Sequence, residues 1–171
     1  MLVHLVFGGA ASGKSVFAEK LAAAASQKVC YIATAPHLDD LAWQDKIQKH
    51  QQRRPSYWQT IEAPLLLAQA IKSQQHNNTL ILVDCVSLWL SNQLLANADV
   101  AKVSADLCQV LHHTDAHIIL VSNEVGMGIV PEYALSRQFR EAQGQLNQQL
   151  AQVADQVDMV IAGLPLHLKG E

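Results

Sequence analysis

Short, strongly apolar segments alternate along the chain with longer segments in which apolar residues recur every three or four positions. The first pattern is typical of parallel β-strands covered on both faces, and the second is typical of amphipathic helices. Strands are predicted over residues 2–7, 29–34, 79–84, 117–122 and 158–163, with a shorter, more polar strand over 57–62 near a sheet edge. Helices are predicted over residues 14–25, 64–75, 86–96, 100–113 and 132–155.

This alternation predicts an α/β fold, with a mostly parallel sheet of about six or seven strands flanked by helices and joined by right-handed crossovers. The length of 171 residues suits one compact domain, and no repeat or Gly/Ser linker divides the chain. We therefore expect residues 1–171 to form a single domain. The least regular stretch, residues 35–55, is interpreted as a functional insertion.

Composition and charge argue against several classes of protein. The net charge is −3, and the twelve Lys and Arg residues are scattered, which argues against a general nucleic-acid binder. No apolar run approaches the roughly 20 residues that cross a bilayer, so we expect a soluble, cytoplasmic protein without stable membrane insertion. The three cysteines form no CxxC pair, and Cys30 and Cys85 lie in apolar runs, so we expect buried, reduced thiols.

The stretch GGAASGKS, from Gly8 to Ser15, matches the pattern GxxxxGK[ST] and lies between a predicted strand and a predicted helix. In such a loop, backbone N–H groups and the helix N-terminus surround phosphate oxygens, while Lys14 reaches the β- and γ-phosphates. A chance match in a glycine turn is the alternative, but the strand–loop–helix context favours a nucleoside triphosphate site. The predicted phosphate-binding residues are Gly8, Gly9, Ala10, Ala11, Ser12, Gly13, Lys14 and Ser15.

Asp84 ends the apolar stretch TLILVD, which places its carboxylate at the carboxyl edge of the sheet, where open α/β sheets bind ligands. An aspartate in this place holds Mg²⁺ directly or through water, although an aspartate that caps the next helix has the same pattern. The predicted magnesium ligands are Asp84 and the hydroxyl of Ser15.

His50 lies in the stretch KIQKHQQRRP, and two roles are consistent with this position. It follows Trp43 and Ile47 at helical spacing, so it can simply pack on a helix face. Alternatively, Arg53 and Arg54 are fork-shaped phosphate ligands, and a neutral imidazole beside them can attack phosphorus to form a covalent phosphoramidate. A metal role is disfavoured because no zinc-type ligand spacing accompanies His50.

Six segments carry a resemblance to a known family, and they occur in this order: FGGAASGKS, YIATA, the H-x-x-R-R-P of residues 50–55, the W-x-T-x-E of residues 58–62, LVDCVSLWLSN and VSNEVGMGIVPEYALSRQFREAQGQLNQQLA. Together they closely resemble the bifunctional adenosylcobinamide kinase / adenosylcobinamide-phosphate guanylyltransferase family of cobalamin assembly, over nearly the whole chain. The resemblance implies a P-loop NTPase fold of the RecA-like type.

Two reactions are implied by the resemblance. Adenosylcobinamide is first phosphorylated from GTP or ATP with Mg²⁺, with Lys14 at the phosphates. The matching histidine, His50, then attacks the α-phosphate of GTP and becomes guanylylated, and adenosylcobinamide phosphate takes up the GMP to give adenosylcobinamide-GDP. The resemblance also implies a homotrimer. A simple P-loop kinase without a covalent intermediate, and a nucleotide-dependent switch protein, are the alternatives.

The nucleotide contacts of the family carry over to positions beyond the loop. Glu62 can accept hydrogen bonds from a guanine edge, or it can be a solvated strand end. The family loop often has an arginine where this chain has Ala11, which puts any help from that arginine in doubt. The implied contacts outside residues 8–15 are Thr34, Ala35, Pro36, Gln51, Gln52, Arg53, Arg54, Glu62 and Asp84.

Four further residues are weaker candidates. Asn123 and Glu124 end a predicted strand at the same sheet edge as Asp84 and begin a glycine-bearing segment. Arg137 and Arg140, three residues apart on a predicted helix, can meet a phosphate or a neighbouring subunit, or they can form an ordinary solvated helix face.

Overall fold

The computed structural model describes residues 2–25, 28–36, 44, 48, 52, 54–75 and 78–170. His50, Gln51 and Arg53, together with most of the predicted insertion at 35–55, lie outside these residues. The strands are β1 (Leu2–Gly8), β2 (Lys28–Ala33), β3 (Gln59–Glu62), β4 (Thr79–Asp84), β5 (His117–Asn123), β6 (Gln156–Ile161) and β7 (Leu164–Lys169). The helices are α1 (Lys14–Ala24), α3 (Leu67–Gln74), α4 (Val86–Leu95), α5 (Val100–His112) and α6 (Ala134–Val153).

The described strands form one seven-stranded sheet in the order β3-β2-β4-β5-β1-β6-β7, in which only β7 runs antiparallel to its neighbour. The predicted α/β fold with a mostly parallel sheet is therefore confirmed, as is the edge position of the polar strand β3. The prediction missed β7. Its residues are all exposed and include Pro165, so it lacks the buried apolar run by which the other strands were recognised.

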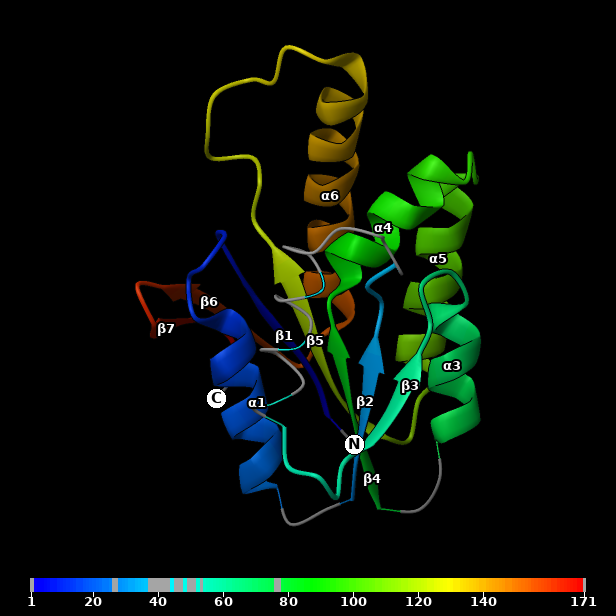
Figure 1. The fold of residues 1–171 in the computed structure, drawn as a ribbon, viewed down its shortest axis with the longest axis vertical. Coiled ribbons are helices and arrows are strands. Elements are labelled where there is room, and N and C mark those ends of the chain that lie inside the picture. The colour runs from blue at the N-terminus through cyan, green and yellow to red at the C-terminus, as the bar shows by residue number, and fades with distance from the viewer. Residues whose placement is uncertain are drawn as a thin grey trace.

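The helices divide unequally between the two faces of the sheet, as Figure 1 shows, with α1 on one face and α3 to α6 on the other. Each face has its own apolar cluster. The one beneath α1 includes Val6, Ala18 and Tyr31, and the larger one beneath α3 to α6 includes Leu5, Trp89 and Leu150. Because both faces are covered, the central strands bury most of their residues and expose none fully. None of the described helices is both long enough and apolar enough to span a bilayer.

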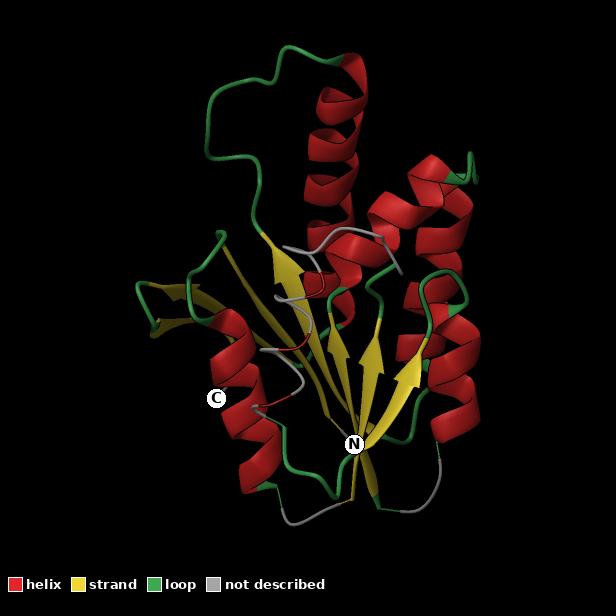
Figure 2. Cartoon of the chain, in the orientation of Figure 1, coloured by secondary structure: helices red, strands yellow, loops and turns green. Residues whose placement is uncertain are grey.

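The parallel register brings the predicted site residues to one edge. Gly8 pairs with Asn123 across β1 and β5, and Ala33 of β2 pairs with both Asp84 of β4 and Glu62 of β3. In Figure 2 the ends of these strands and the loops that follow them face the same side of the molecule, and α6 projects beyond that side. Strands that end together in this way are where α/β sheets bind ligands.

A buried carboxylate ties the last hairpin to the first strand. Asp158 of β6 is 2.7 Å from Nε2 of the buried His4 on β1 and 3.0 Å from Nδ1 of His167 on β7. The other nitrogen of His167, Nε2, is 2.8 Å from the carbonyl oxygen of Gly170. Both nitrogens of His167 therefore face acceptors, and only the protonated imidazolium donates to both. Consistent with this geometry, the Gly170 carbonyl and the Asp158 carboxylate raise the pKa of His167 above its ordinary value.

We expect the contribution of His167 to stability to depend on pH. Because the folded-state pKa is raised, the stabilisation is fully present below the unfolded-state value of 6.5 and is lost as the pH rises through the folded-state pKa. His167→Gln should therefore lower the free energy of unfolding more at about pH 5.5 than at about pH 8.5. Urea denaturation at both pH values measures this difference, with replacement of the exposed His112 by Gln as the control. Equal losses for His167→Gln at the two pH values would contradict the expectation.

Candidate nucleotide-binding site

The loop between β1 and α1 has the compact form that phosphate binding requires. Gly13 takes a φ of 94° as the residue before α1, and the Ser12 N–H donates to the Gly9 carbonyl at 3.2 Å. Lys14 is only 8% exposed, and its Nζ donates to the Gly9 carbonyl at 3.0 Å. The loop thus folds around the lysine ammonium, which holds its charge next to the N–H groups at the start of α1.

The hairpin between β6 and β7 supports this loop from one side. The Gly163 N–H donates to the Ser12 carbonyl at 2.8 Å. A Cβ on Gly13 would lie 3.0 Å from the Gly163 Cα, and a Cβ on Gly8 would overlap the Val160 carbonyl oxygen. Two of the loop glycines are therefore required by close packing against the hairpin, in addition to any contact with phosphate. The Ser12 hydroxyl oxygen is buried and, in the described part of the chain, has no hydrogen-bond partner.

Ala11, where the family often has an arginine, is exposed and takes a φ of 56°. The hydrogen bonds of the loop given above are donated by Ser12, Lys14 and Gly163 to backbone carbonyls. None of them involves the side chain of Ala11. The phosphate-binding frame of the loop therefore does not depend on the side chain at this position.

Asp84 ends β4 beside the loop, and its carboxylate is held by a buried tyrosine. The hydroxyl of Tyr31 on β2 donates to Asp84 Oδ2 at 3.0 Å. Burial, and then the negative charge of Asp84, raise the pKa of Tyr31, so the hydroxyl keeps its proton and acts as the donor. Burial, followed by Asp84, also raises the pKa of the next residue, Cys85, to about 12, while the charge of Lys14 opposes that shift. Asp84 and Lys14 therefore act electrostatically on the same group.

Thr34 holds the junction between β4 and α4 in place. Its side chain is fully buried; Oγ1 donates to the Cys85 carbonyl at 2.6 Å and accepts from the Cys85 N–H at 3.0 Å. The Thr34 carbonyl accepts from Asn92 Nδ2 at 2.9 Å. The Thr34 hydroxyl thus fixes the backbone that follows Asp84, and Ala35 and Pro36, half-buried, continue from it along the edge. The predicted contacts of residues 34–36 with nucleotide stay predictions.

Arg54 lies against the same tyrosine. Its guanidinium carbon is 3.4 Å from the centre of the Tyr31 ring, which is the distance of a stacked cation–π contact. The Arg54 Nε is buried and has no hydrogen-bond partner in the described ranges. The contact brings the arginine of the H-x-x-R-R-P segment to the strand end that carries Asp84. Of the other predicted residues in this segment, Gln52 is exposed.

Glu62 ends β3 at the same edge, two strands away from Asp84 in the sheet order. It borders a cleft of about 510 Å³ with a largely apolar wall that includes Pro64, Leu65 and Leu66. A carboxylate at the rim of an apolar cleft suits a flat heterocycle with N–H groups on its edge.

Arg137 and Arg140 support the loop that follows β5. Arg140 donates to the Gly126 carbonyl at 2.5 Å, and Arg137 donates to the Glu132 carbonyl at 2.5 Å and to the Pro131 carbonyl at 3.2 Å. The Glu124 carboxylate accepts from the Gly126 N–H in the same loop. These arginines therefore bind the backbone of residues 126–132, where sequence reasoning considered a phosphate or a neighbouring subunit.

Asn123, at the end of β5, is positioned by a buried polar network between the sheet and two helices. Its N–H donates to Ser87 Oγ of α4 at 2.7 Å, and its carbonyl accepts from Asn147 of α6 at 3.0 Å. Behind it, Gln143 donates to Ser122 at 3.0 Å and to Asn147 at 2.9 Å. Sequence reasoning did not single out Ser87, Gln143 or Asn147, because polar residues on a helix are ordinarily exposed.

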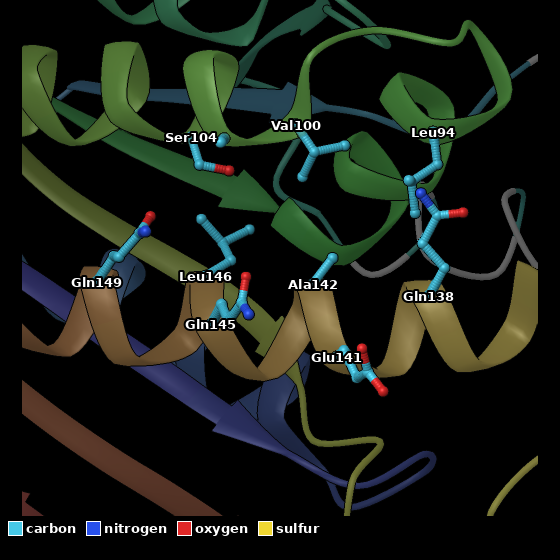
Figure 3. A pocket seen from close by; sticks show the side chains of 10 residues that line it. Leu94, Val100, Ser104, Gln138, Glu141, Ala142, Gln145, Leu146 and Gln149 are labelled. Atoms are coloured by element: carbon cyan, nitrogen blue, oxygen red, sulfur yellow. The ribbon is translucent and has the colours of Figure 1, made fainter.

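A second hollow, shown in Figure 3, lies between α6 and the region where α4 ends and α5 begins. It has a volume of about 240 Å³ and is lined by apolar residues such as Leu94 and Leu146 together with Gln145, Gln149 and Glu141. Among the residues that the structure describes, none from the loop 8–15 or the strand ends lines it, and its lining includes no lysine or arginine. It is therefore unsuited to phosphate, and the edge of the sheet is the candidate nucleotide site.

The donors at this edge suit magnesium better than a transition metal. Within the described residues, no group of three or more His, Cys, Asp and Glu side chains could hold a metal on its own. Mg²⁺ needs only one or two protein oxygens, because phosphate oxygens and water complete its shell. The predicted ligands, the Ser15 hydroxyl and the Asp84 carboxylate, are oxygens of this kind.

Solved structures share this fold at low sequence identity. The chain is similar to the flagellar accessory protein FlaH of Methanocaldococcus jannaschii, with a TM-score of 0.53 and 16% identity, over 99% of this chain and 79% of that one. It is also similar to the RadB recombinase, with a TM-score of 0.54 and 15% identity, over 92% of this chain and 73% of that one. The fold and the loop together define a P-loop NTPase of the RecA-like type.

Sequence comparison identifies the family of P-loop NTPases to which the chain belongs. Residues 4–168 match the model of the family described as cobinamide kinase / cobinamide phosphate guanyltransferase, and the chain belongs to that family. It is 43% identical to the bifunctional adenosylcobalamin biosynthesis protein CobP of Pseudomonas aeruginosa, over 98% of this chain and 97% of that protein. It is 39% identical to the bifunctional adenosylcobalamin biosynthesis protein CobU of Escherichia coli K12, over 98% of this chain and 100% of that protein. The resemblance drawn from the six segments is confirmed.

The packing of the loop against the hairpin predicts different effects for two adjacent glycines. Gly8→Ala places a methyl group against the Val160 carbonyl, whereas a Cβ on Gly9 meets nothing within 4 Å. We expect Gly8→Ala to weaken GTP binding at least about tenfold more than Gly9→Ala, because only the first displaces the loop. Titration of each purified variant with a fluorescent GTP analogue measures the two affinities. Equal losses would show that the Val160 contact does not shape the loop.

Proposed function

We propose that this protein phosphorylates adenosylcobinamide with GTP or ATP and then transfers GMP from GTP to the product, giving adenosylcobinamide-GDP. The observation that carries the proposal is the meeting, at one sheet edge, of the phosphate-binding loop, the Asp84 carboxylate and Arg54, in a chain that matches the family over residues 4–168. The substrates are adenosylcobinamide, adenosylcobinamide phosphate and the nucleoside triphosphate.

In the first reaction, the hydroxyl oxygen of adenosylcobinamide attacks the γ-phosphorus and the bond to the bridging oxygen of the β-phosphate breaks. The loop N–H groups and Lys14 hold the β- and γ-phosphates, so that the charge developing on their oxygens is met by fixed donors. Magnesium, held by Ser15 and Asp84, would neutralise charge on the phosphate oxygens.

In the second reaction, His50 is the nucleophile. One imidazole nitrogen forms a bond to the α-phosphorus of GTP while the bond to the β-phosphate oxygen breaks and pyrophosphate leaves. A phosphate oxygen of adenosylcobinamide phosphate then attacks the same phosphorus, and the phosphorus–nitrogen bond breaks to restore the imidazole. Arg53 and Arg54, with Gln51 and Gln52, lie within four residues of His50 and would bind the phosphate oxygens.

The proposed single domain leaves apolar residues uncovered, which supports contacts between subunits; the homotrimer is the assembly that the family resemblance implies. The loop after β5 exposes Met127, Ile129 and Val130, and the edge strand β7 exposes Leu164 and Leu166. Exposed apolar segments and unpaired sheet edges are features that subunit contacts commonly cover. We propose no nucleic-acid partner and a cytoplasmic location, in accordance with the scattered basic residues and the biosynthetic family.

The covalent step can be tested by intact-protein mass spectrometry. Incubation with GTP and Mg²⁺ should add the mass of one GMP to the protein, and His50→Asn should remove this addition because the nucleophilic nitrogen is lost. The adduct should be acid-labile, as a phosphoramidate is. His112→Asn, on an exposed histidine of α5, provides the matched control and should still form the adduct.

The results for His50→Asn separate the rival functions. A variant that phosphorylates adenosylcobinamide but forms no adduct supports two reactions with a dedicated histidine. A wild-type protein that phosphorylates adenosylcobinamide without ever forming an adduct would be a simple kinase. A protein that hydrolyses GTP slowly and acts on neither cobinamide would be a switch protein, and both activities would then be excluded.

The role proposed for Glu62 predicts a change in nucleotide preference. Glu62→Gln replaces one of two acceptor oxygens by a donor, so the side chain no longer complements the N–H edge of guanine. We expect the preference for GTP over ATP to fall roughly tenfold or more, because in the variant the N–H groups of the guanine edge are left without a full set of hydrogen-bond acceptors. Competition of GTP and ATP against a fluorescent analogue measures the ratio. Gln69→Glu, on the same cleft, tests whether any charge change there has this effect.

A further inference from the structure

Tyr31 is a buried polar residue beneath the nucleotide edge to which the sequence assigned no role. It lies in the middle of β2, on the face covered by α1, and is 2% exposed. A tyrosine in such a place can serve packing alone, in which case phenylalanine would do equally well. Two contacts of its polar and aromatic parts distinguish it from a packing residue.

The first contact is the hydrogen bond from the Tyr31 hydroxyl to Asp84 Oδ2, at 3.0 Å. One oxygen of the carboxylate is thereby held from below, by a donor whose own position is fixed by the surrounding apolar cluster. A carboxylate that keeps one orientation loses less freedom when it takes up a cation or a metal-bound water.

The second contact is the stacking of Arg54 on the ring face, with 3.4 Å between the guanidinium carbon and the ring centre. Stacking leaves the edge of a guanidinium free to donate hydrogen bonds in the plane of the group, which is the arrangement that phosphate recognition uses. The ring thus fixes the plane of an arginine that lies four residues after His50 in the sequence.

We infer that Tyr31 is a positioning residue that serves both halves of the site, orienting Asp84 through its hydroxyl and Arg54 through its ring. The inference rests on the proposed function, in which Asp84 supports Mg²⁺ and Arg54 supports guanylyl transfer. The two parts of one side chain therefore have separable effects: the hydroxyl acts on the magnesium requirement, and the ring acts on the transfer of GMP.

Two substitutions separate the hydroxyl from the ring. Tyr31→Phe removes the hydrogen bond to Asp84 and keeps the ring under Arg54, whereas Tyr31→Leu removes both. Tyr57→Phe is the matched control, because Tyr57 is 77% exposed. Each full-length variant is first compared with the wild type by circular dichroism and thermal melting, so that only folded protein is assayed.

The first measurement is binding of a fluorescent GTP analogue over a range of Mg²⁺ concentrations, which requires no catalysis. We expect Tyr31→Phe and Tyr31→Leu to raise the Mg²⁺ concentration for half-maximal effect by roughly tenfold, as for the loss of a hydrogen bond to a charged group. Tyr57→Phe should match the wild type. An unchanged magnesium midpoint in folded Tyr31→Phe would overturn the role of the hydroxyl.

The second measurement is the rate of GMP adduct formation at saturating Mg²⁺. Tyr31→Phe should react at nearly the wild-type rate, whereas Tyr31→Leu should react about threefold to tenfold more slowly, because the stacked arginine is no longer held. Equal rates for the two variants would overturn the role of the ring. A wild-type protein that forms no adduct would refute the proposed guanylyl transfer instead, and the magnesium titration would still decide the part played by the hydroxyl.

Discussion

The parallel pairing of the central strands is the constraint on which the site depends. Parallel strands in register end together, so residues far apart in the sequence come to one edge without any direct attraction between them. Gly8 and Asn123 are paired across β1 and β5, and Asp84 and Glu62 are both paired with Ala33 of β2. The site is thus assembled by backbone hydrogen bonds and by the burial of both sheet faces, before any polar side chain makes its own contribution.

Buried polar side chains then fix details that the sheet alone leaves free. Thr34 binds both the N–H and the carbonyl of Cys85, and Asn147 binds the carbonyl of Asn123, so the backbone at two strand ends is held from beneath. Such groups are costly to bury without partners and stabilising only when the partners are present, which makes their geometry specific.

The sequence predicted those parts of the fold and site that depend on local pattern. The apolar runs located five strands and a shorter, more polar segment located a sixth, while the glycine pattern between a strand and a helix located the phosphate-binding loop around Lys14. It did not predict β7, whose residues are all exposed, nor the stacking of Arg54 on Tyr31, because contacts between distant residues leave no local signal. The roles of Arg137 and Arg140 were open for the same reason, since their partners are backbone carbonyls of a preceding loop.

The hairpin that the missed strand completes contacts the phosphate-binding loop through β6 and the turn. The β6–β7 hairpin turns at Gly163, whose N–H donates to the Ser12 carbonyl, and the Val160 carbonyl of β6 limits what can stand at Gly8. Val160 lies near the end of β6 and Gly163 lies in the turn that follows, so the tight turn brings both to the same loop. β7 pairs with β6 from the Ile161–Leu164 end to the Val157–Lys169 end, and this pairing fixes the turn in the position where the Gly163 N–H meets the loop.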